Sequence, residues 1–145
     1  GVAEGTVRLS RKVTLFFSVY EEVGHGASCG LPEDTEDLLV VDMGCVGEGL
    51  SCREQQVSIC AKDSSGPYDY EMTGELIALA KSNGIDYAVD VYPAYGSDAA
   101  AALRAGRDVR FALIGAGVYA SHGYERSHRK GVENTLRLIE AVVTA

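Results

Sequence analysis

The chain has 145 residues, of which 46% are apolar and 23% are charged, and its net charge is −8. This composition is typical of an ordinary globular domain that can bury a core. The acidic balance argues against nucleic acid or an anionic membrane as the main partner, and no stretch reaches the roughly 18 consecutive apolar residues of a membrane span. The four cysteines include no Cys-x-x-Cys pair and the first residues contain no apolar signal core, so we expect reduced thiols in a cytoplasmic protein.

Three strands are predicted in the first part of the chain. Residues 13–20 (VTLFFSVY) form a near-continuous apolar run, typical of a strand covered on both faces, and Glu21-Glu22 and a glycine-containing turn follow. A second strand is expected at residues 37–42. Residues 55–61 alternate more strongly, which predicts a third strand that lies nearer an edge of the sheet or has a half-exposed face.

Strands and helices alternate along the rest of the chain, and the last strand leads into a glycine-rich loop. The expected elements are a helix at 69–82, a strand at 87–92, a helix at 97–103 capped by Ser97-Asp98, a strand at 109–114, a loop at 115–117 and a helix at 130–143. Such alternation predicts crossover connections. We therefore expect an α/β fold with three α/β/α layers, in which helices cover both faces of a mostly parallel mixed sheet. Ligands of such sheets bind beyond the carboxyl ends of the strands.

Acidic and imidazole side chains fall at these predicted strand ends or in the loops after them. Glu21 and Glu22 follow the first strand, Asp42 ends the second, and His128 lies in the loop after the last. Carboxylates and imidazole are the usual ligands of zinc, cobalt or manganese in hydrolases. A metal would also offset the cost of bringing like-charged carboxylates together in a partly dry crevice.

Each of these residues also has a simpler interpretation. A glutamate pair is usually solvated surface, and Asp42 can equally cap a turn beside Gly44. A histidine in a loop is more often a surface group than a ligand, and His25 and His122 compete with His128 for such a role. Taken one at a time, the positions leave both interpretations open.

Four segments, in the same order and spacing, resemble the glutamyl-aminopeptidase family, which is metallopeptidase family forty-two of clan MH and includes the tetrahedral aminopeptidases. Residues 16–27 (FFSVYEEVGHGA) resemble its Glu-Glu-Val-Gly-x-x-Gly-Ala motif, and residues 40–42 (VVD) its Val-Asp strand end. Residues 95–99 (YGSDA) resemble its Gly-Thr-Asp-Ala segment, and residues 124–128 (YERSH) its histidine-containing loop. The likeness extends from about Lys12 onward.

The resemblance implies a zinc-peptidase-like fold and a dinuclear-metal aminopeptidase, in which a glutamate base acts on a metal-bound water. By position, Glu21 matches the general base, Glu22 and His128 match ligands of one metal, and Asp42 matches a ligand of the other. Two divalent ions (zinc, cobalt or manganese), peptide substrates with a free N-terminus and a homo-oligomer are expected. The histidine loop departs from the commoner family arrangement, which leaves His122 as an alternative to His128.

The family's site also needs a histidine and a metal-bridging aspartate that have no counterpart here, and the family's inserted dimerisation domain is absent. We therefore expect residues 1–145 to be the C-terminal half of the catalytic domain, to need the N-terminal half as a partner, and to be inactive alone. Two other functions remain open. One is a related deacylase or carboxypeptidase of the same clan, and the other is a non-catalytic assembly or binding module.

Overall fold

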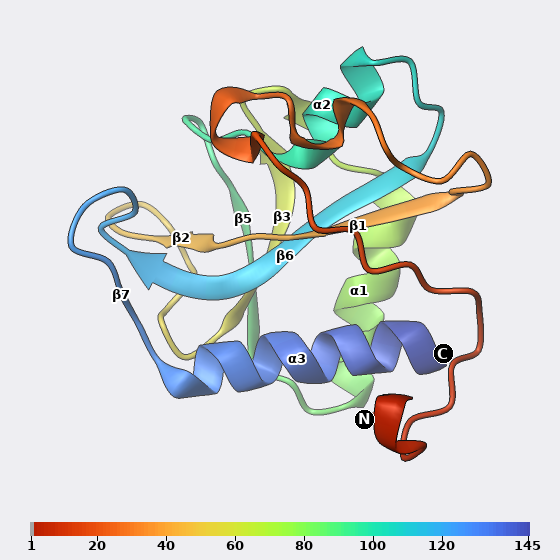
Figure 1. The fold of residues 1–145 in the computed structure, drawn as a ribbon. Helices are drawn as coiled ribbons and strands as arrows, with labels where there is room; N and C mark the ends of the chain where they lie inside the picture. Colours follow the sequence, from red (N-terminus) through yellow and green to blue (C-terminus); the bar gives the residue numbers. More distant parts are fainter. Residues whose placement is uncertain (1) are drawn as a thin grey trace.

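A computed structural model describes residues 2–145 as a layered α/β domain (Figure 1). Three α-helices are present in this part of the chain, α1 (Tyr70–Ser82), α2 (Asp98–Arg104) and α3 (Arg129–Thr144). Short 3-10 helices span Val2–Glu4 (η1), Glu21–Val23 (η2) and Gly26–Ser28 (η3). None of the helices in the described part of the chain is both long and apolar enough to cross a bilayer.

The strands form one mixed sheet. They are β1 (Asp37–Val41), β2 (Gly44–Val46), β3 (Val57–Asp63), β4 (Gly66–Pro67), β5 (Tyr87–Val91), β6 (Arg110–Tyr119) and β7 (Arg126–Ser127). β6 pairs in parallel with β1 and β2, and β5 pairs in parallel with β3. β3 runs antiparallel to β6 and so joins the two parallel pairs. Crossover connections would by themselves give only parallel pairs, so the antiparallel pairing of β3 with β6 is an addition to the expected pattern.

Helices cover both faces of the sheet, as expected. α1 and α3 pack on one face, where Val57, Ile59 and Ile114 meet Leu76 and Leu138 in one buried cluster. α2 covers the other face, on which Cys60, Tyr92 and Leu113 pack with Ala99. Figure 1 shows α2 and α3 on opposite sides of the sheet. Successive residues of a strand point to opposite faces, which is why Leu113 and Ile114 belong to different clusters.

The predicted strand at residues 13–20 is absent from the described structure, which is a correction to the expectation. The segment has no regular secondary structure, and Leu15, Phe17 and Val19 are 78%, 87% and 68% exposed. The reason is that an apolar run forms a buried strand only when neighbouring layers cover it. Here the segment lies outside the sheet, tied at its start by an ion pair of 2.6 Å between Lys12 and Asp34.

Two further expectations about strands were wrong. β3 lies between β5 and β6 and most of its residues are buried, although its alternating pattern suggested an edge strand or a half-exposed face. Its polar residue Ser58 is 1% exposed and forms a 2.5 Å hydrogen bond with the Tyr92 hydroxyl, which satisfies it inside the core. The predicted loop at 115–117 is instead the continuation of β6. A Cβ at Gly115 would lie 1.3 Å from the Asp42 carbonyl oxygen, so these glycines allow close backbone approach rather than a turn.

Candidate active site

β1 and β6 run in the same direction because they pair in parallel, but β1 ends opposite Ile114 while β6 continues to Tyr119. Asp42 follows β1, and its backbone N–H donates to the Ile114 carbonyl of β6 at 3.0 Å. The loop after β6 contains His122, and β7 and α3 follow it. The register therefore places Asp42 beside the middle of β6, and β2 rather than β1 pairs with the end of β6 that precedes this loop.

Glu21 and Glu22 begin the single turn of η2. The turn opens with Tyr20 in the left-handed conformation (φ 66°) and closes with Gly24 (φ 78°), whose N–H donates to the Glu21 carbonyl at 2.8 Å. These two conformations bend the chain sharply on either side of the glutamates. The pair therefore lies on a bend rather than at the strand end that the sequence predicted, and η2 itself contains no buried residue.

The pKa of Glu21 is raised above its ordinary value. The largest cause is partial burial, and the negative charges of Asp42, Asp98 and Glu22 add to it, while His122 acts in the opposite direction. Glu21 thus lies within electrostatic reach of all four side chains, although they come from separate parts of the chain. A carboxyl group with a raised pKa in a cluster of acids is the kind of group that can accept and return a proton.

Tyr95 holds the backbone beside Asp42. Its hydroxyl donates to the Met43 carbonyl at 2.8 Å, and the Met43 N–H donates to the Asp42 carboxylate at 2.5 Å. Burial raises the pKa of the Tyr95 hydroxyl well above its usual range, and the nearby Asp42 charge adds to this, so the phenol stays protonated. Sequence reasoning gave Tyr95 no role. Its place within the family-like YGSDA segment is the signal that could have found it.

Of the two competing imidazoles, His122 lies beside the glutamate pair. Its Nε2 is 3.7 Å from Oε2 of Glu22, and both side chains are exposed. His128 instead caps α3, where its Nδ1 accepts the Lys130 N–H at 3.0 Å. A neutral imidazole that accepts through Nδ1 carries its proton on Nε2, so neither nitrogen of His128 offers a free lone pair in this arrangement.

Backbone strain collects around the same residues. Within the described chain, the non-glycine residues with positive φ are Tyr20, Ala120 and His122, at 66°, 58° and 62°. One precedes Glu21, and the other two lie in the loop that carries the imidazole. Such conformations cost about 1–3 kcal/mol each and gather at functional sites. The Glu125 carboxylate accepts the His122 N–H at 3.0 Å and so supports the strained turn.

These residues suit a divalent cation in kind but not in arrangement. Carboxylates and imidazole are suitable donors, and burial together with the acidic neighbours raises the pKa of Glu21 and so disfavours a further negative charge there. Nevertheless, among residues 2–145 no group of three or more His, Cys, Asp or Glu side chains has the geometry to hold a metal ion. A pocket of about 530 Å³ lies at the other edge of the sheet, where Asp37 and Arg110 line it, and none of the candidate residues does.

A sequence model of the M42 glutamyl aminopeptidases matches residues 3–138. The chain belongs to this family. It is also 46% identical over 119 residues to a Bacillus subtilis (strain 168) protein named "Putative aminopeptidase YhfE", covering 82% of this chain and 34% of that protein. The family match agrees with the order of the acidic and histidine-containing segments described above.

Solved structures of tetrahedral and related aminopeptidases share the fold of this family member. The Pyrococcus horikoshii TET1 peptidase, described as assembling into a tetrahedron or a large octahedral shell, superposes with a TM-score of 0.76 at 23% identity, over 88% of this chain and 39% of its own. Aminopeptidase APDkam598 of Desulfurococcus kamchatkensis gives a TM-score of 0.78 at 20% identity, over 88% and 39%. The chain thus spans between a third and two fifths of the length of the relatives it matches.

Proposed function

We propose that residues 1–145 are the C-terminal half of the catalytic domain of a metal-dependent aminopeptidase, which removes N-terminal residues from peptides. The observation that carries the proposal is the position of Glu21, a carboxyl group whose pKa is raised by burial and by the charges of Asp42, Asp98 and Glu22, in a chain of the glutamyl aminopeptidase family. The shorter length of the chain relative to its relatives supports the view that the other half contributes to the site.

Glu21 is the proposed general base. Its carboxylate would take a proton from the attacking water and return it to the leaving amine, a role that a raised pKa favours because the carboxylate then binds a proton more readily. Tyr95 and Met43 would fix the Asp42 carboxylate close by. When bound, divalent cations would polarise the scissile carbonyl and acidify water.

Glu22 and Asp42 are the proposed carboxylate ligands, one for each of two cations (zinc, cobalt or manganese). For the imidazole ligand beside Glu22, the described geometry favours His122, which is 3.7 Å from it. His128 remains the second candidate because it directly follows β7, but it would first have to release the Lys130 N–H. The remaining ligands would come from the N-terminal half, since residues 2–145 by themselves bring no three potential ligands together.

The assembly and location of the protein belong to the same proposal. The Pyrococcus horikoshii TET1 peptidase is described as assembling into a tetrahedron or a large octahedral shell, and we extend a homo-oligomeric state to the longer protein by analogy. The four cysteines are free, which agrees with a cytoplasmic location.

The test uses a family-length protein that contains these 145 residues, with an aminoacyl anilide as substrate. Glu21→Gln should lower kcat by on the order of 10²–10⁴-fold while metal content stays the same, because a general base contributes that much. A peptide with a blocked N-terminus should not be cleaved, which separates an aminopeptidase from a deacylase or carboxypeptidase. The 145-residue chain alone should be inactive.

Metal content of His122→Ala and His128→Ala in the same protein decides between the imidazoles. Loss of metal in His122→Ala alone would support the arrangement described above, and loss in His128→Ala alone would mean that His128 leaves its cap to bind. If wild type binds no metal and hydrolyses neither free nor blocked peptides, the enzymatic proposal fails. A non-catalytic binding module would then be the better explanation.

A further inference from the structure

The turn that carries Glu21 and Glu22 has no fully buried side chain to hold it in place. η2 contains no buried residue, and its hydrogen bonds are internal, from Gly24 to the Glu21 carbonyl and from the His25 N–H to the Tyr20 carbonyl at 3.0 Å. A single exposed turn of this kind frays readily, because nucleation fixes several backbone dihedrals for very few bonds. Its position must therefore be set by the neighbouring residues of the chain.

The next turn, η3, is pressed against the first residue of α2. Gly26 and Ala27 are buried, and the Ala27 N–H donates to Oδ1 of Asp98 at 3.1 Å. A Cβ at Gly26 would lie only 1.9 Å from the same oxygen. The Asp98 carboxylate thus lies directly against the backbone of Gly26 and Ala27. The sequence suggested that it caps its own helix, and instead it binds this separate turn.

The base of this contact is rigid. Behind Asp98, the residues Ala99, Ala101 and Ala102 of α2 are 1%, 4% and 0% exposed, so the start of the helix is fixed by packing. An ion pair of η2 itself joins Glu22 to His122 at 3.7 Å, with both side chains more than 75% exposed. Exposed pairs of this type contribute little. Asp98 therefore provides the principal anchor.

We infer that Asp98 is the positioning residue of the catalytic turn: it accepts the Ala27 N–H, lies against Gly26, and so fixes where Glu21 and Glu22 stand relative to Asp42. The catalytic part of this inference rests on the proposed function, whereas the anchoring part does not. The charge of Asp98 also contributes to the raised pKa of Glu21, which agrees with a position of Asp98 close to the turn.

Amide hydrogen exchange of the 145-residue chain tests the anchor without any assay of activity. Asp98→Ala should speed exchange of the Ala27 amide at least about tenfold, because a hydrogen bond to a charged acceptor is lost. Asp98→Asn keeps an oxygen acceptor and should hold the rate within about threefold of wild type. The matched control is Asp69→Ala, which removes a carboxylate that accepts the Met72 N–H at 2.8 Å in α1. It should leave Ala27 unchanged.

Kinetics of the family-length protein test the positioning role. Asp98→Ala should lower kcat by roughly tenfold to a hundredfold with KM within about threefold, and Asp98→Asn should restore most of the loss, because misplacement of a reacting group acts mainly on kcat. Unchanged Ala27 exchange in Asp98→Ala, or faster exchange with unchanged kcat, would overturn the inference. If wild type shows no hydrolysis, the proposed function fails, and the exchange experiment alone decides whether Asp98 is the anchor.

Discussion

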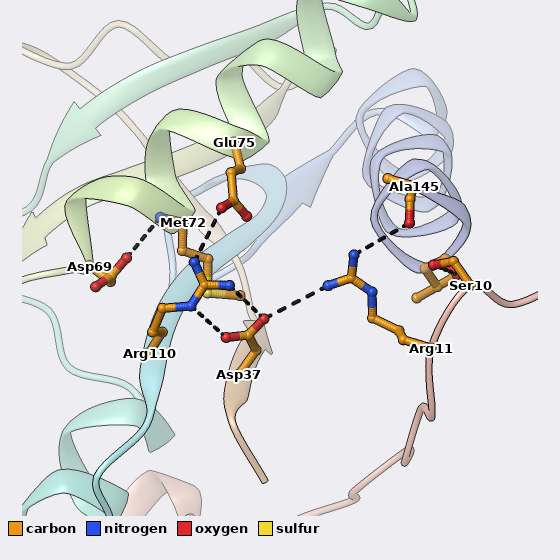
Figure 2. A network of polar contacts seen from close by, with 9 residues as sticks. Ser10, Arg11, Asp37, Asp69, Met72, Glu75, Arg110 and Ala145 are labelled. Carbon is orange, nitrogen blue, oxygen red and sulfur yellow. Dashed lines mark hydrogen bonds and ion pairs between the residues drawn. The ribbon is translucent and has the colours of Figure 1, made fainter.

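Arg110 binds Asp37 through two parallel hydrogen bonds, from Nε to Oδ1 at 2.7 Å and from Nη2 to Oδ2 at 2.8 Å. The two residues are directly opposite each other where β1 and β6 begin, so the pair joins the starts of both strands. Glu75 of α1 accepts a third bond at 3.2 Å, as Figure 2 shows. Both carboxylates hold the pKa of the Arg110 guanidinium above its usual range.

Arg110→Ala should therefore lower the free energy of unfolding by about 1–2 kcal/mol, since bidentate pairs contribute more than single exposed pairs. Urea unfolding monitored by circular dichroism measures the change. Lys12→Ala, which removes an exposed ion pair with Asp34, should leave the midpoint where it is. Equal effects of the two substitutions would show that the Asp37 pair adds no more than an ordinary surface contact.

Two helical glycines should respond in opposite directions to the same substitution. Gly74 in α1 has no atom within 4 Å of an added Cβ, so Gly74→Ala should raise stability by about 0.5–1 kcal/mol. A Cβ at Gly131 in α3 would lie 2.3 Å from the Glu54 carbonyl oxygen, so Gly131→Ala should lower stability by about 1–3 kcal/mol. Thermal unfolding of both variants provides the measurement, and a gain at Gly131 would contradict the close packing of α3.

The buried hydrogen bond between Ser58 and Tyr92 can be tested with a double-mutant cycle. Tyr92→Phe or Ser58→Ala alone leaves one buried hydroxyl without its partner, at a cost of about 1–3 kcal/mol. The double variant should be less destabilised than the sum of the two by about 1 kcal/mol or more. Strict additivity of the unfolding free energies would mean that the two hydroxyls do not stabilise each other.

The cysteines should differ in how fast they react with an alkylating reagent, because they differ in exposure. Cys29 is exposed, whereas Cys52 and Cys60 are 3% and 1% exposed, so iodoacetamide should label Cys29 in the folded chain and the other two after unfolding. Peptide mass spectrometry identifies the labelled sites. Labelling of Cys52 at the rate of Cys29 in the native protein would contradict its burial.

The same burial predicts a pH dependence of stability. Desolvation, with a smaller contribution from Asp90, raises the pKa of Cys52 from 9.0 to about 12. Between these values the unfolded chain loses the proton and the folded chain keeps it, so the contribution of Cys52 is complete below pH 9 and is lost as pH rises towards 12. Unfolding free energies measured across this range should fall less steeply in Cys52→Ala, and identical slopes would argue against the shift.

The sequence predicted most of the elements because their signals are local. The apolar spacing of residues 69–82 and 130–143 matches α1 and α3 closely, and the β-branched run at 37–42 matches β1. The segment at 13–20 has an equally strong local signal, yet it forms no strand. Strand formation depends on a neighbour along the sheet edge, and this information does not lie in the segment itself.

The roles of the candidate site residues stay a prediction, and the structure adds geometry that local signals in the sequence do not contain. Parallel pairing of β1 with β6 could be inferred from alternation, but the extension of β6 to Tyr119, which leaves Asp42 beside the middle of β6, could not. The choice between His122 and His128 could not be inferred from the sequence, because it depends on a left-handed backbone at His122 and on a helix cap formed by His128. The hydrogen bond from the Ala27 N–H to Asp98 could not be inferred either, because it depends on contact between distant segments of the chain.

The glycines of β6 also have a consequence for how the sheet assembles. Side chains at positions 115 and 117 would collide with the carbonyl oxygens of Asp42 and Arg53, at 1.3 and 2.4 Å. A slip of β6 by one residue would bring Ile114 or Ala116 against these carbonyls, and so would be rejected by sterics as well as by the reversal of every buried side chain. Gly115 and Gly117, which have no side chain, therefore select a single register and keep Asp42 from shifting along β6.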